Sequence, residues 1–532
     1  MLFSLVLLAC TDDVSDSGDT DLPQDTGTSN DADGDGVSAD TDCDDADPEV
    51  GEGTVWYADV DGDGFGDPSA ETIACEQPDD AVDNADDCDD SSSLAQPGDS
   101  AELCDGLDND CNGEVDDSTD WATVPGTWPN LSTAVLNGLT HPVVCLQAGT
   151  HDPLRVPEDK DMTVISAAGS EATFISGEGT NNALVVDGSL VLEGVTLIEG
   201  YPAENSGGAG LLVDGGHLEG RDIVIDGIAG ASGQTYGAAL FFGGATFTME
   251  DFEVRNVELS TTLNAYGLVL VYDSSGDFTN VTVRDNTVTG DNVWGGIFVW
   301  NGASVMTDVD LLNNTYTGNT VSGLGLMAQS NGVIDATRVR VLENRVVGTH
   351  GGGAFVASSY GELTVRNAIV AGQEAPFPPL VTNGGSAVLN VDNATVVGNA
   401  SSLGGVGYFA GASTSVALLN NVIAANNSAD EGSLWYGKDD GSYTRSTYYL
   451  FDNNVSGDDQ VKAGTFAGGP WYGSGGVEGA PGFVDVGGDD ATAWDLRLAS
   501  DSPARNAGDP ELLNLDGSVS DQGAFGGPDA WQ

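Results

Sequence analysis

GGIFVWNGASVMTDVDLLNN, residues 295–314, is the stretch that decides the fold. It contains two hydrophobic segments separated by the turn pair Asn301-Gly302, and its apolar side chains recur at every second position in the longer one. This alternation is typical of a β-strand with one buried face. The same order of small residues, strand, turn and second strand recurs at residues 208–227 and 404–427. The stretch is therefore one unit of a repeat built from strands.

The repeat has a steady period. Its units close on Gly or Asn at Gly200, Gly227, Asn256, Asn286, Asn314, Asn344, Gly372, Asn399 and Asn427. A period near 28 with alternating strands predicts a β-solenoid, and a parallel β-helix of about nine coils is the simplest form. A β-propeller is the alternative, but its blades need about 40 residues. The closing asparagines predict a ladder of side-chain hydrogen bonds with a structural role.

The two ends of the solenoid need covers. Residues 127–138 predict a short helix, with Pro129 in its first turn and Gly138 at its end. We expect this helix to plug the N-terminal end of a β-helix over residues 121–430. Residues 431–532 follow as an irregular C-terminal cap.

Arginines fall at equivalent places in the predicted coils. Counting back from the closing residues aligns Asp308, Arg338 and Arg366 in one outward column and Asp310 with Arg340 in another. Opposite charges in adjacent strands favour pairing between coils. The alternative interpretation is a small basic patch of Arg338, Arg340 and Arg366 that binds an acidic sugar.

The N-terminal part has an extreme charge. The chain has 14 Lys and Arg against 85 Asp and Glu, a net charge of −71. Residues 11–120 contain 38 acidic side chains and no Lys or Arg. Such a surface repels nucleic acid, which excludes that class of partner. A segment without positive charges either stays solvated or folds around metal ions. We expect a solvated tether at 11–30 and metal-binding repeats at 31–120.

Three loops in this segment carry oxygen ligands at positions 1, 3 and 5 and glycine at position 6, which lets a short chain curl round one cation. Hard oxygen ligands and the absence of His before His141 favour calcium over zinc or copper. Clustered carboxylates also predict a fold that depends on its Ca²⁺. The predicted ligands are Asp31, Asp33, Asp35 and Asp42; Asp59, Asp61, Asp63 and Asp67; and Asp108, Asp110, Asn112 and Asp116.

The first ten residues, MLFSLVLLAC, look like a lipoprotein signal in which Cys10 becomes lipidated. The alternatives are an ordinary cleaved signal and a chance apolar start. The signal predicts a lipid-anchored protein at the bacterial outer membrane or cell surface that touches the membrane through its anchor only. Export makes disulfides the expectation for the other cysteines. Cys75 with Cys88 and Cys104 with Cys111 are the pairs close in sequence, and the pairing of Cys43 and Cys145 stays open.

Two resemblances extend these predictions. DxDGDGxGDP at 59–68, DDCDD at 86–90 and ELCDGLDNDCNGEVDD at 102–117 resemble the bacterial metal-binding motif of the MopE type, and more loosely the thrombospondin type 3 calcium repeats. Residues 480–510 and 516–527 resemble the ending of right-handed β-helix proteins of the pectin-lyase-like fold, a likeness that covers about residues 140–532. It implies a right-handed parallel β-helix and is weak as to activity.

No catalytic constellation stands out in the sequence. The order of anchor, tether, metal repeats and solenoid favours a calcium-binding surface lipoprotein that presents its β-helix for adhesion or for glycan or protein binding without catalysis. Aromatic residues such as Trp300 and Tyr408 could stack on sugar rings, although packing at the core is the commoner role. The alternative function is a polysaccharide lyase or glycoside hydrolase, supported by fold analogy and by the three arginines.

Overall fold

A computed structural model divides the chain into two compact units, residues 1–101 with 108–113 (unit 1) and residues 102–107 with 114–532 (unit 2). The predicted signal, Cys10 and the tether at 11–30 lie outside the described residues. No helix among the described residues is long and apolar enough to cross a membrane. The structure describes residues 31–39, 41–98, 101–118, 120–137, 143–201, 207–230, 233–410, 415–438, 443–447, 449–452, 454–456, 462–464, 470–472, 475–488 and 490–531.

Unit 1 is a loop-rich module around one small antiparallel sheet in the order β2-β1-β3. Its strands are β1 (Thr54–Ala58), β2 (Glu71–Ala74) and β3 (Ala81–Val82). Ala95 is the one apolar side chain that is buried among the described residues of this unit. A module without a hydrophobic core needs disulfides or metal ions to stay folded.

The described residues form three disulfides, and their pairing differs from the close pairs expected from the sequence. The bonds join Cys43 to Cys75, Cys88 to Cys111, and Cys104 to Cys145. The expectation was wrong because closeness in sequence does not set the direction of the side chains. The sulfur of Cys104 lies 3.4 Å from the carbonyl oxygen of Ile165 in unit 2, whereas Cys111 belongs to unit 1.

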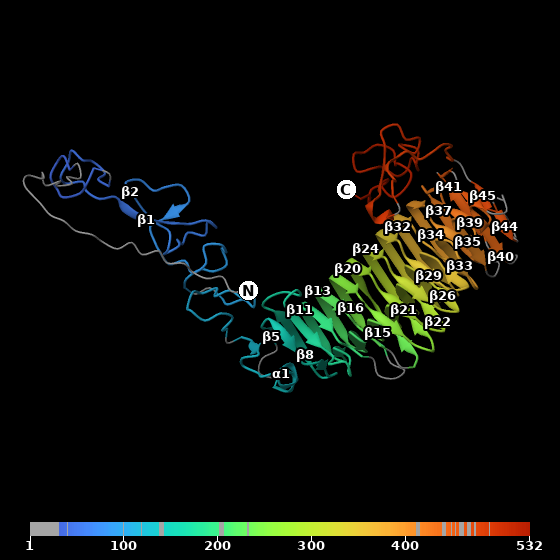
Figure 1. Cartoon of the computed structure of the whole chain (residues 1–532), viewed down its shortest axis with the longest axis horizontal. Helices are drawn as coiled ribbons and strands as arrows, with labels where there is room; N and C mark the ends of the chain where they lie inside the picture. Colours follow the sequence, from blue (N-terminus) through green and yellow to red (C-terminus); the bar gives the residue numbers. More distant parts are fainter. Residues whose placement is uncertain are drawn as a thin grey trace, which may run out of the picture. The chain divides into compact units, whose positions relative to one another are not determined.

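Unit 2 is the predicted parallel β-solenoid, and Figure 1 shows its strands stacked as successive rungs. One wall is a 12-stranded parallel sheet, so about ten full turns replace the nine expected. The 12-stranded sheet comprises β7 (Leu154–Val156), β10 (Leu184–Val186), β12 (Leu211–Asp214), β15 (Leu240–Gly243), β19 (Val269–Tyr272), β23 (Ile297–Trp300), β27 (Leu326–Gln329), β31 (Phe355–Ser358), β33 (Leu380–Asn383), β36 (Gly407–Ala410), β40 (Trp435–Lys438) and β44 (Lys462–Gly464).

The second wall, called the long-strand sheet, follows the 12-stranded sheet in every coil. Its central strands bend at one residue in the left-handed region, such as Asp251 at φ 52° and Asn280 at φ 54°. Asn and Asp tolerate this conformation better than most residues. The strands are β4 (Ala122–Val124), β5 (Val143–Leu146), β6 (Gly149–His151), β8 (Asp161–Ser166), β9 (Thr173–Ser176), β11 (Ser189–Ile198), β13 (His217–Asp226), β16 (Thr246–Arg255), β20 (Ser275–Arg284), β24 (Ala303–Leu312), β28 (Val333–Leu342), β32 (Glu362–Ala371), β34 (Val388–Val397), β37 (Val416–Asn420), β38 (Ile423–Ala425), β41 (Tyr443–Thr447), β42 (Leu450–Asp452) and β45 (Pro470–Tyr472).

Narrow parallel ladders complete each coil and return the chain to the 12-stranded sheet. Two of them run on the side that follows the long strands: β17 (Glu258–Ser260), β21 (Thr287–Thr289), β25 (Thr315–Thr317) and β29 (Arg345–Val347), then β35 (Ala400–Leu403), β39 (Ser428–Glu431) and β43 (Val455–Ser456). The third ladder precedes the 12-stranded sheet: β14 (Thr235–Tyr236), β18 (Ala265–Tyr266), β22 (Asn292–Trp294), β26 (Thr320–Ser322) and β30 (His350–Gly352).

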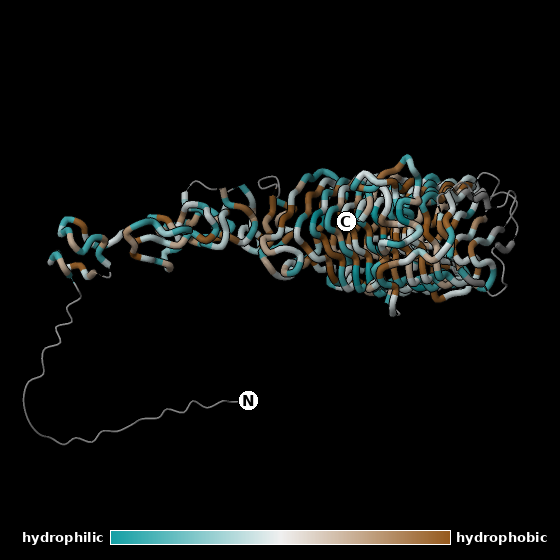
Figure 2. Tube along the Cα trace, turned by 90° about the horizontal axis from the view of Figure 1, so that it is seen from above, coloured by the Kyte–Doolittle hydropathy of each residue, from teal (hydrophilic) through white to brown (hydrophobic). Residues whose placement is uncertain are grey.

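The hydrophobic core fills the inside of the coils. Residues along a long strand such as β16 alternate between exposed and buried, and Figure 2 shows the matching alternation of hydropathy along the coils. Phe242, Phe247 and Phe278 stack within this core, with ring centroids 3.8 and 4.8 Å apart. Burial of apolar surface inside the walls therefore holds the solenoid together.

A short helix covers the N-terminal end, as predicted. Helix α1 (Leu131–Asn137) begins later than the expected residue 127, because Asn130 accepts the N–H of Thr133 at 2.9 Å and caps it. Leu131, Ala134 and Val135 are buried in the core of the solenoid. The helix thus closes the open end of the core.

The predicted asparagine ladder is present, and the structure corrects its register. The amides of Asn286 and Asn314 each donate to the next coil's amide oxygen at 2.9 Å. Further along, Asn399 bonds to Asn427 at 2.8 Å. The ladder position of the intervening coil is Gln373 and not Gly372, and that of an earlier coil is Val257 and not Asn256. Gly372 and Asn256 hold the neighbouring left-handed position, at φ 65° and 54°.

The one-residue error at Gly372 also affects the predicted column of charged residues that contains Arg366. Arg340 is in register with Asp310 as expected, whereas Arg366 lies beside Thr337 and not beside Arg338. The expected column of Asp308, Arg338 and Arg366 is therefore wrong at Arg366, because it was counted from Gly372.

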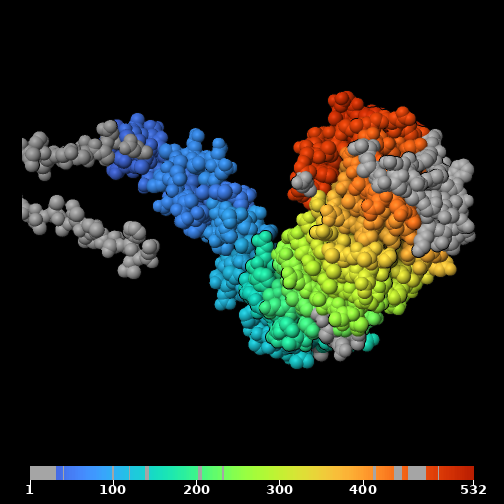
Figure 3. All heavy atoms as spheres, turned by 45° about the vertical axis from the view of Figure 1, so that its right-hand side comes forward, coloured from blue at the N-terminus to red at the C-terminus, as the bar shows by residue number. Residues whose placement is uncertain are grey.

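The solenoid continues past residue 430 through β45, and the C-terminal segment folds back onto its side. This cap segment, residues 475–531, contains β46 (Phe483–Asp485), the 3₁₀ helix η1 (Ala491–Ala493) and β47 (Asp495–Leu498). Figure 3 shows it, in red, packed against the coils. Asn367 donates to the carbonyls of Ala524 and Gly526, at 2.9 and 2.6 Å, so the cap segment is tied to the bends of the long strands.

Candidate metal centres and aromatic groove

In each of the three acidic loops the first aspartate accepts hydrogen bonds from backbone N–H groups later in the same loop. In the second loop Asp59 accepts the N–H groups of Gly62 and Gly64, at 2.8 and 3.2 Å, and Asp61 accepts that of Asp63 at 3.1 Å. The first loop repeats these bonds from Asp31 and Asp33. In the third loop Asp108 accepts the N–H groups of Asn112 and Gly113, at 3.0 and 2.7 Å. Loop position 4 has positive φ in each case, which Gly34 and Gly62 adopt without strain.

The loops bring their carboxylates together. Oxygens of Asp31, Asp33 and Asp35 lie within 4.8 Å of one another, as do those of Asp59, Asp61 and Asp63. The side-chain Oδ2 atoms of Asp33, Asp42, Asp61 and Asp63 are buried and accept no hydrogen bond. A buried carboxylate oxygen without a donor is costly unless a cation is present. These residues therefore fit a bound metal ion.

Two further carboxylates join the second loop, and the sequence prediction missed them. Asp87 and Asp90 approach Asp61 within the same 4.8 Å limit. Asp87 is only 3% exposed, and its Oδ2 accepts no hydrogen bond. Asp90 accepts the N–H of Val60 at 2.7 Å, which ties it to the loop. The DDCDD stretch was a signal for this, but position counting within one loop cannot reveal ligands 26 residues away.

Two predicted ligands lie elsewhere. Both oxygens of Asp67 accept bonds from Ser69, at 2.7 Å from its N–H and 2.8 Å from its hydroxyl. Asp116 belongs to unit 2, where it accepts the N–H groups of Asp105 and Gly106 and the side-chain amide of Gln147. The structure does not bring either residue into the clusters of unit 1.

Several of the clustered carboxylates have raised pKa values. Burial raises the pKa of Asp61 and of Asp87, and repulsion from Asp63 and Asp90 adds to both. Burial likewise raises the pKa of Asp33. An aspartate whose pKa is raised in the folded state contributes stability that is present below its usual value of 3.8 and lost as the pH rises through the raised pKa.

The metal-free protein should therefore resist urea better at about pH 4, near the usual aspartate pKa, than at about pH 7. The full chain is equilibrated with urea and EDTA at each pH, and residues 54–90 are then pulse-labelled by hydrogen exchange at one fixed pH. A higher urea midpoint for these peptides at the lower pH is expected. An equal or lower midpoint would contradict the mutual repulsion.

The three arginines of the suggested sugar patch are each paired with an aspartate of the preceding coil. Arg338 donates to Asp308 at 2.8 Å, Arg340 to Asp310 at 2.6 Å, and Arg366 to Asp335. Arg340 also lies over the ring of Trp531, 5.4 Å from its centroid. These contacts agree with the interpretation that the arginines pair with aspartates of neighbouring coils. Because each guanidinium is already paired, little positive charge is left to bind an acidic sugar.

Aromatic rings line a groove on the outer side of the 12-stranded sheet. Tyr236, Tyr266 and Trp294 come from the adjacent narrow ladder and stack with ring centroids 5.0 and 4.4 Å apart. They cover the outward residues of the sheet, among them Leu270 and Phe298, which are fully buried although they point away from the core. Trp300 and Tyr272 meet edge to face at 5.4 Å. A cavity of about 420 Å³ is lined by Gly207, Leu212, Asp214, Tyr236, Phe241, Tyr272 and Trp300.

The aromatic residues that were candidates for stacking on sugar rings lie in different surroundings. Trp300 lines the groove, whereas Tyr408 is 5% exposed and stacks between Phe377 and Tyr436. Trp435 is fully buried in the core. Periodicity alone could not separate these positions, because the outward residues of the 12-stranded sheet are themselves covered by the ladder rings.

Fold and site together define a parallel β-helix protein with an acidic module whose clustered carboxylates fit a metal ion. Residues 209–401 match the family described as "Right handed beta helix region", and residues 42–54 and 87–117 match the MopE-type family described as "Putative metal-binding motif". The second match includes Asp87 and Asp90. No curated protein matches the chain.

Three solved structures are similar to this chain at low sequence identity and low TM-score. The catalytic domain of a GH87 α-1,3-glucanase in complex with nigerose is 11% identical, with 67% of this chain and 68% of that chain covered and a TM-score of 0.32. The Agl-KA catalytic domain is 13% identical over 74% and 70%, with a TM-score of 0.33. The PL6 family alginate lyase AlyGC is 10% identical over 68% and 99%, with a TM-score of 0.17. Likenesses this low carry no argument about activity.

Proposed function

We propose that this protein is a calcium-binding lipoprotein of the bacterial cell envelope, anchored through Cys10, whose β-helix binds a neutral glycan in the aromatic groove. The calcium assignment is supported by ligand sets made of carboxylate oxygens without His or free thiolate, which is the chemistry of a hard cation. The anchor is supported by the apolar sequence that ends in Cys10.

The aromatic groove is the observation that supports the assignment of glycan binding. Partly exposed rings such as Tyr236, Tyr272 and Trp300 suit the apolar faces of sugar rings, and a polar group such as Asp214 can accept hydrogen bonds from sugar hydroxyls. The net charge of −71 opposes binding of an acidic polysaccharide. Asp214 is the single carboxylate among the groove-lining residues, and glycosidases use two. We therefore assign binding, not cleavage, to this groove.

Replacing Trp300 with alanine should weaken glycan binding about tenfold, because one stacking face is lost. Calcium-loaded protein is titrated calorimetrically with maltohexaose, laminarihexaose, cellohexaose and xylohexaose. The matched control is Tyr360→Asn, which removes a ring that is 63% exposed outside the groove and keeps a residue that tolerates its φ of 71°. Binding of none of these oligosaccharides, or equal affinity in Trp300→Ala, would overturn the glycan assignment.

A further inference from the structure

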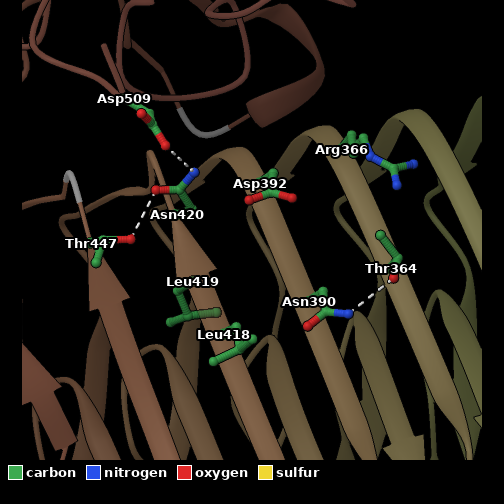
Figure 4. Close-up of a pocket in the computed structure, with 9 residues that line it drawn as sticks. All are labelled: Thr364, Arg366, Asn390, Asp392, Leu418, Leu419, Asn420, Thr447 and Asp509. Carbon is green, nitrogen blue, oxygen red and sulfur yellow. Dashed lines mark hydrogen bonds between the residues drawn. The ribbon is translucent and has the colours of Figure 1, made fainter. Parts of the chain in front are cut away.

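A second hollow lies between the long-strand sheet and the cap segment. Its volume is about 540 Å³, and Figure 4 shows its lining of polar side chains from neighbouring coils. The lining residues are Thr364, Arg366, Asn390, Asp392, Leu418, Leu419, Asn420, Thr447 and Asp509. This polar pocket is distinct from the aromatic groove and shares no residue with it.

Strand register builds one side of the polar pocket. Arg366, Asp392, Asn420 and Thr447 are successive partners in β32, β34, β37 and β41. Parallel pairing places such side chains in one outward row at a spacing of about 4.8 Å. The row therefore presents a guanidinium, a carboxylate, an amide and a hydroxyl side by side.

The cap segment supplies the opposite side through Asp509. Its N–H donates to Asn421 Oδ1 at 2.7 Å, and its Oδ1 accepts the N–H of Glu511 at 3.0 Å, so the backbone there is fixed. Its Oδ2 faces the row and accepts Asn420 Nδ2 at 3.5 Å. Thr447 donates to Asn420 Oδ1 at 2.9 Å, which orients that amide nitrogen toward the carboxylates.

The two carboxylates have different surroundings. Burial raises the pKa of Asp392, and the nearby Asp509 adds to the rise, while the side chains of Asn420 and Arg366 oppose it. Asp509 accepts the side-chain amide of Asn420 and the backbone N–H of Glu511. Two carboxyl groups on opposite sides of one pocket, one of them with a raised pKa, are the parts of an acid–base pair.

We propose that the polar pocket is a hydrolytic site for the O-glycosidic bond of a neutral polysaccharide, with Asp392 as general acid and Asp509 as general base. Asp392 gives its proton to the glycosidic oxygen as the bond between that oxygen and the anomeric carbon breaks. Asp509 takes a proton from water as the water oxygen bonds to the anomeric carbon. One water is consumed, one reducing end and one free hydroxyl form, and solvent returns each carboxyl group to its starting state.

The charges around the polar pocket favour a neutral sugar over an acidic one as substrate. Arg366 is already bonded to Asp335, while Asp392 and Asp509 are both acidic. The pocket therefore offers no unpaired cation to an acidic sugar, and hydroxyl groups suit its Asn and Thr side chains. The proposed hydrolytic site and the aromatic groove are built from different residues. An experiment can therefore contradict one of the two proposals without contradicting the other.

Reducing-end release from soluble starch, dextran, β-1,3-glucan, xylan and galactomannan tests the site in the calcium-loaded full chain. We expect release from at least one polymer, and Asp392→Asn and Asp509→Asn should each lower it at least about a hundredfold. The matched control is Asp277→Asn, an exposed carboxylate on the same sheet face. Circular dichroism confirms that the variants fold.

Release that survives in both variants would overturn the proposal, and so would the absence of release from every polymer. Loss of release together with unchanged oligosaccharide affinity in Asp392→Asn supports it, because the groove would then still bind. Loss in Asp277→Asn of the same size would show a general effect of sheet charge and would also overturn it.

Discussion

Asp87→Asn is expected to weaken calcium binding by the second loop about tenfold to a hundredfold, and to stabilise unit 1 when calcium is absent. In the loaded protein the buried Oδ2 of Asp87 has no hydrogen-bond partner, and the neutral amide removes the charge–charge attraction of this side chain for the cation. In the metal-free protein the same change removes a buried charge next to Asp61 and Asp63. Burial, together with repulsion from these two residues, raises the pKa of Asp87.

The opposite signs make this test specific. Calcium affinity is measured calorimetrically, and the stability of residues 54–90 in EDTA and in calcium is measured by pulse-labelled hydrogen exchange in urea. The control is Asp86→Asn, which neutralises the exposed neighbour and should change the calcium affinity less than about threefold. A variant Asp87→Asn that is destabilised equally with and without calcium would show that Asp87 is a packing residue and not a ligand.

Asn314→Ala should lower the free energy of unfolding of unit 2 by roughly 3–5 kcal/mol. Asn314 is fully buried and donates to the carbonyl of Val283 and to Asn344 Oδ1, both at 2.9 Å. It also accepts the side-chain amide of Asn286 at 2.9 Å. Alanine leaves several of these groups buried without partners, and each costs about 1–3 kcal/mol. The expected readout is a lower urea midpoint by circular dichroism.

A neighbouring position gives the control for this prediction. Asn313 is exposed and has φ 53°, so Asn313→Gly keeps the backbone conformation and should cost at most about 0.5 kcal/mol. Equal midpoints for Asn314→Ala and the wild-type protein would contradict a stabilising ladder. Equal losses in the two variants would place the effect in the turn backbone.

The sequence predicted the repeat because its period and alternation follow directly from strand geometry. The predicted ladder position was wrong by one residue in the coils where two adjacent turn positions carry similar residues. Asn256 and Gly372 look like ladder members, yet the inward positions are Val257 and Gln373. Only hydrogen bonding between coils separates the two, and such bonds join residues about one period apart.

The candidate sites were predictable to different extents. Asp31, Asp33, Asp35, Asp59, Asp61 and Asp63 converge as expected because loop ligands are set by local spacing. Asp87 could not be assigned by spacing, since it reaches Asp61 through the folding of residues 80–90 around the second loop. Asp509 meets Asn420 only because the cap segment folds back across the solenoid. Contacts of this range are properties of the tertiary fold.

Calcium titration of the full-length protein, followed by calorimetry and by hydrogen exchange of residues 31–98, tests the central claim most directly. Saturable binding with protection of both Asp31–Gly36 and Asp59–Gly64 is the result we predict, since buried Oδ2 atoms in these loops have no hydrogen-bond partner. Absence of saturable binding, or binding that leaves exchange in these loops unchanged, would contradict a metal-built unit 1.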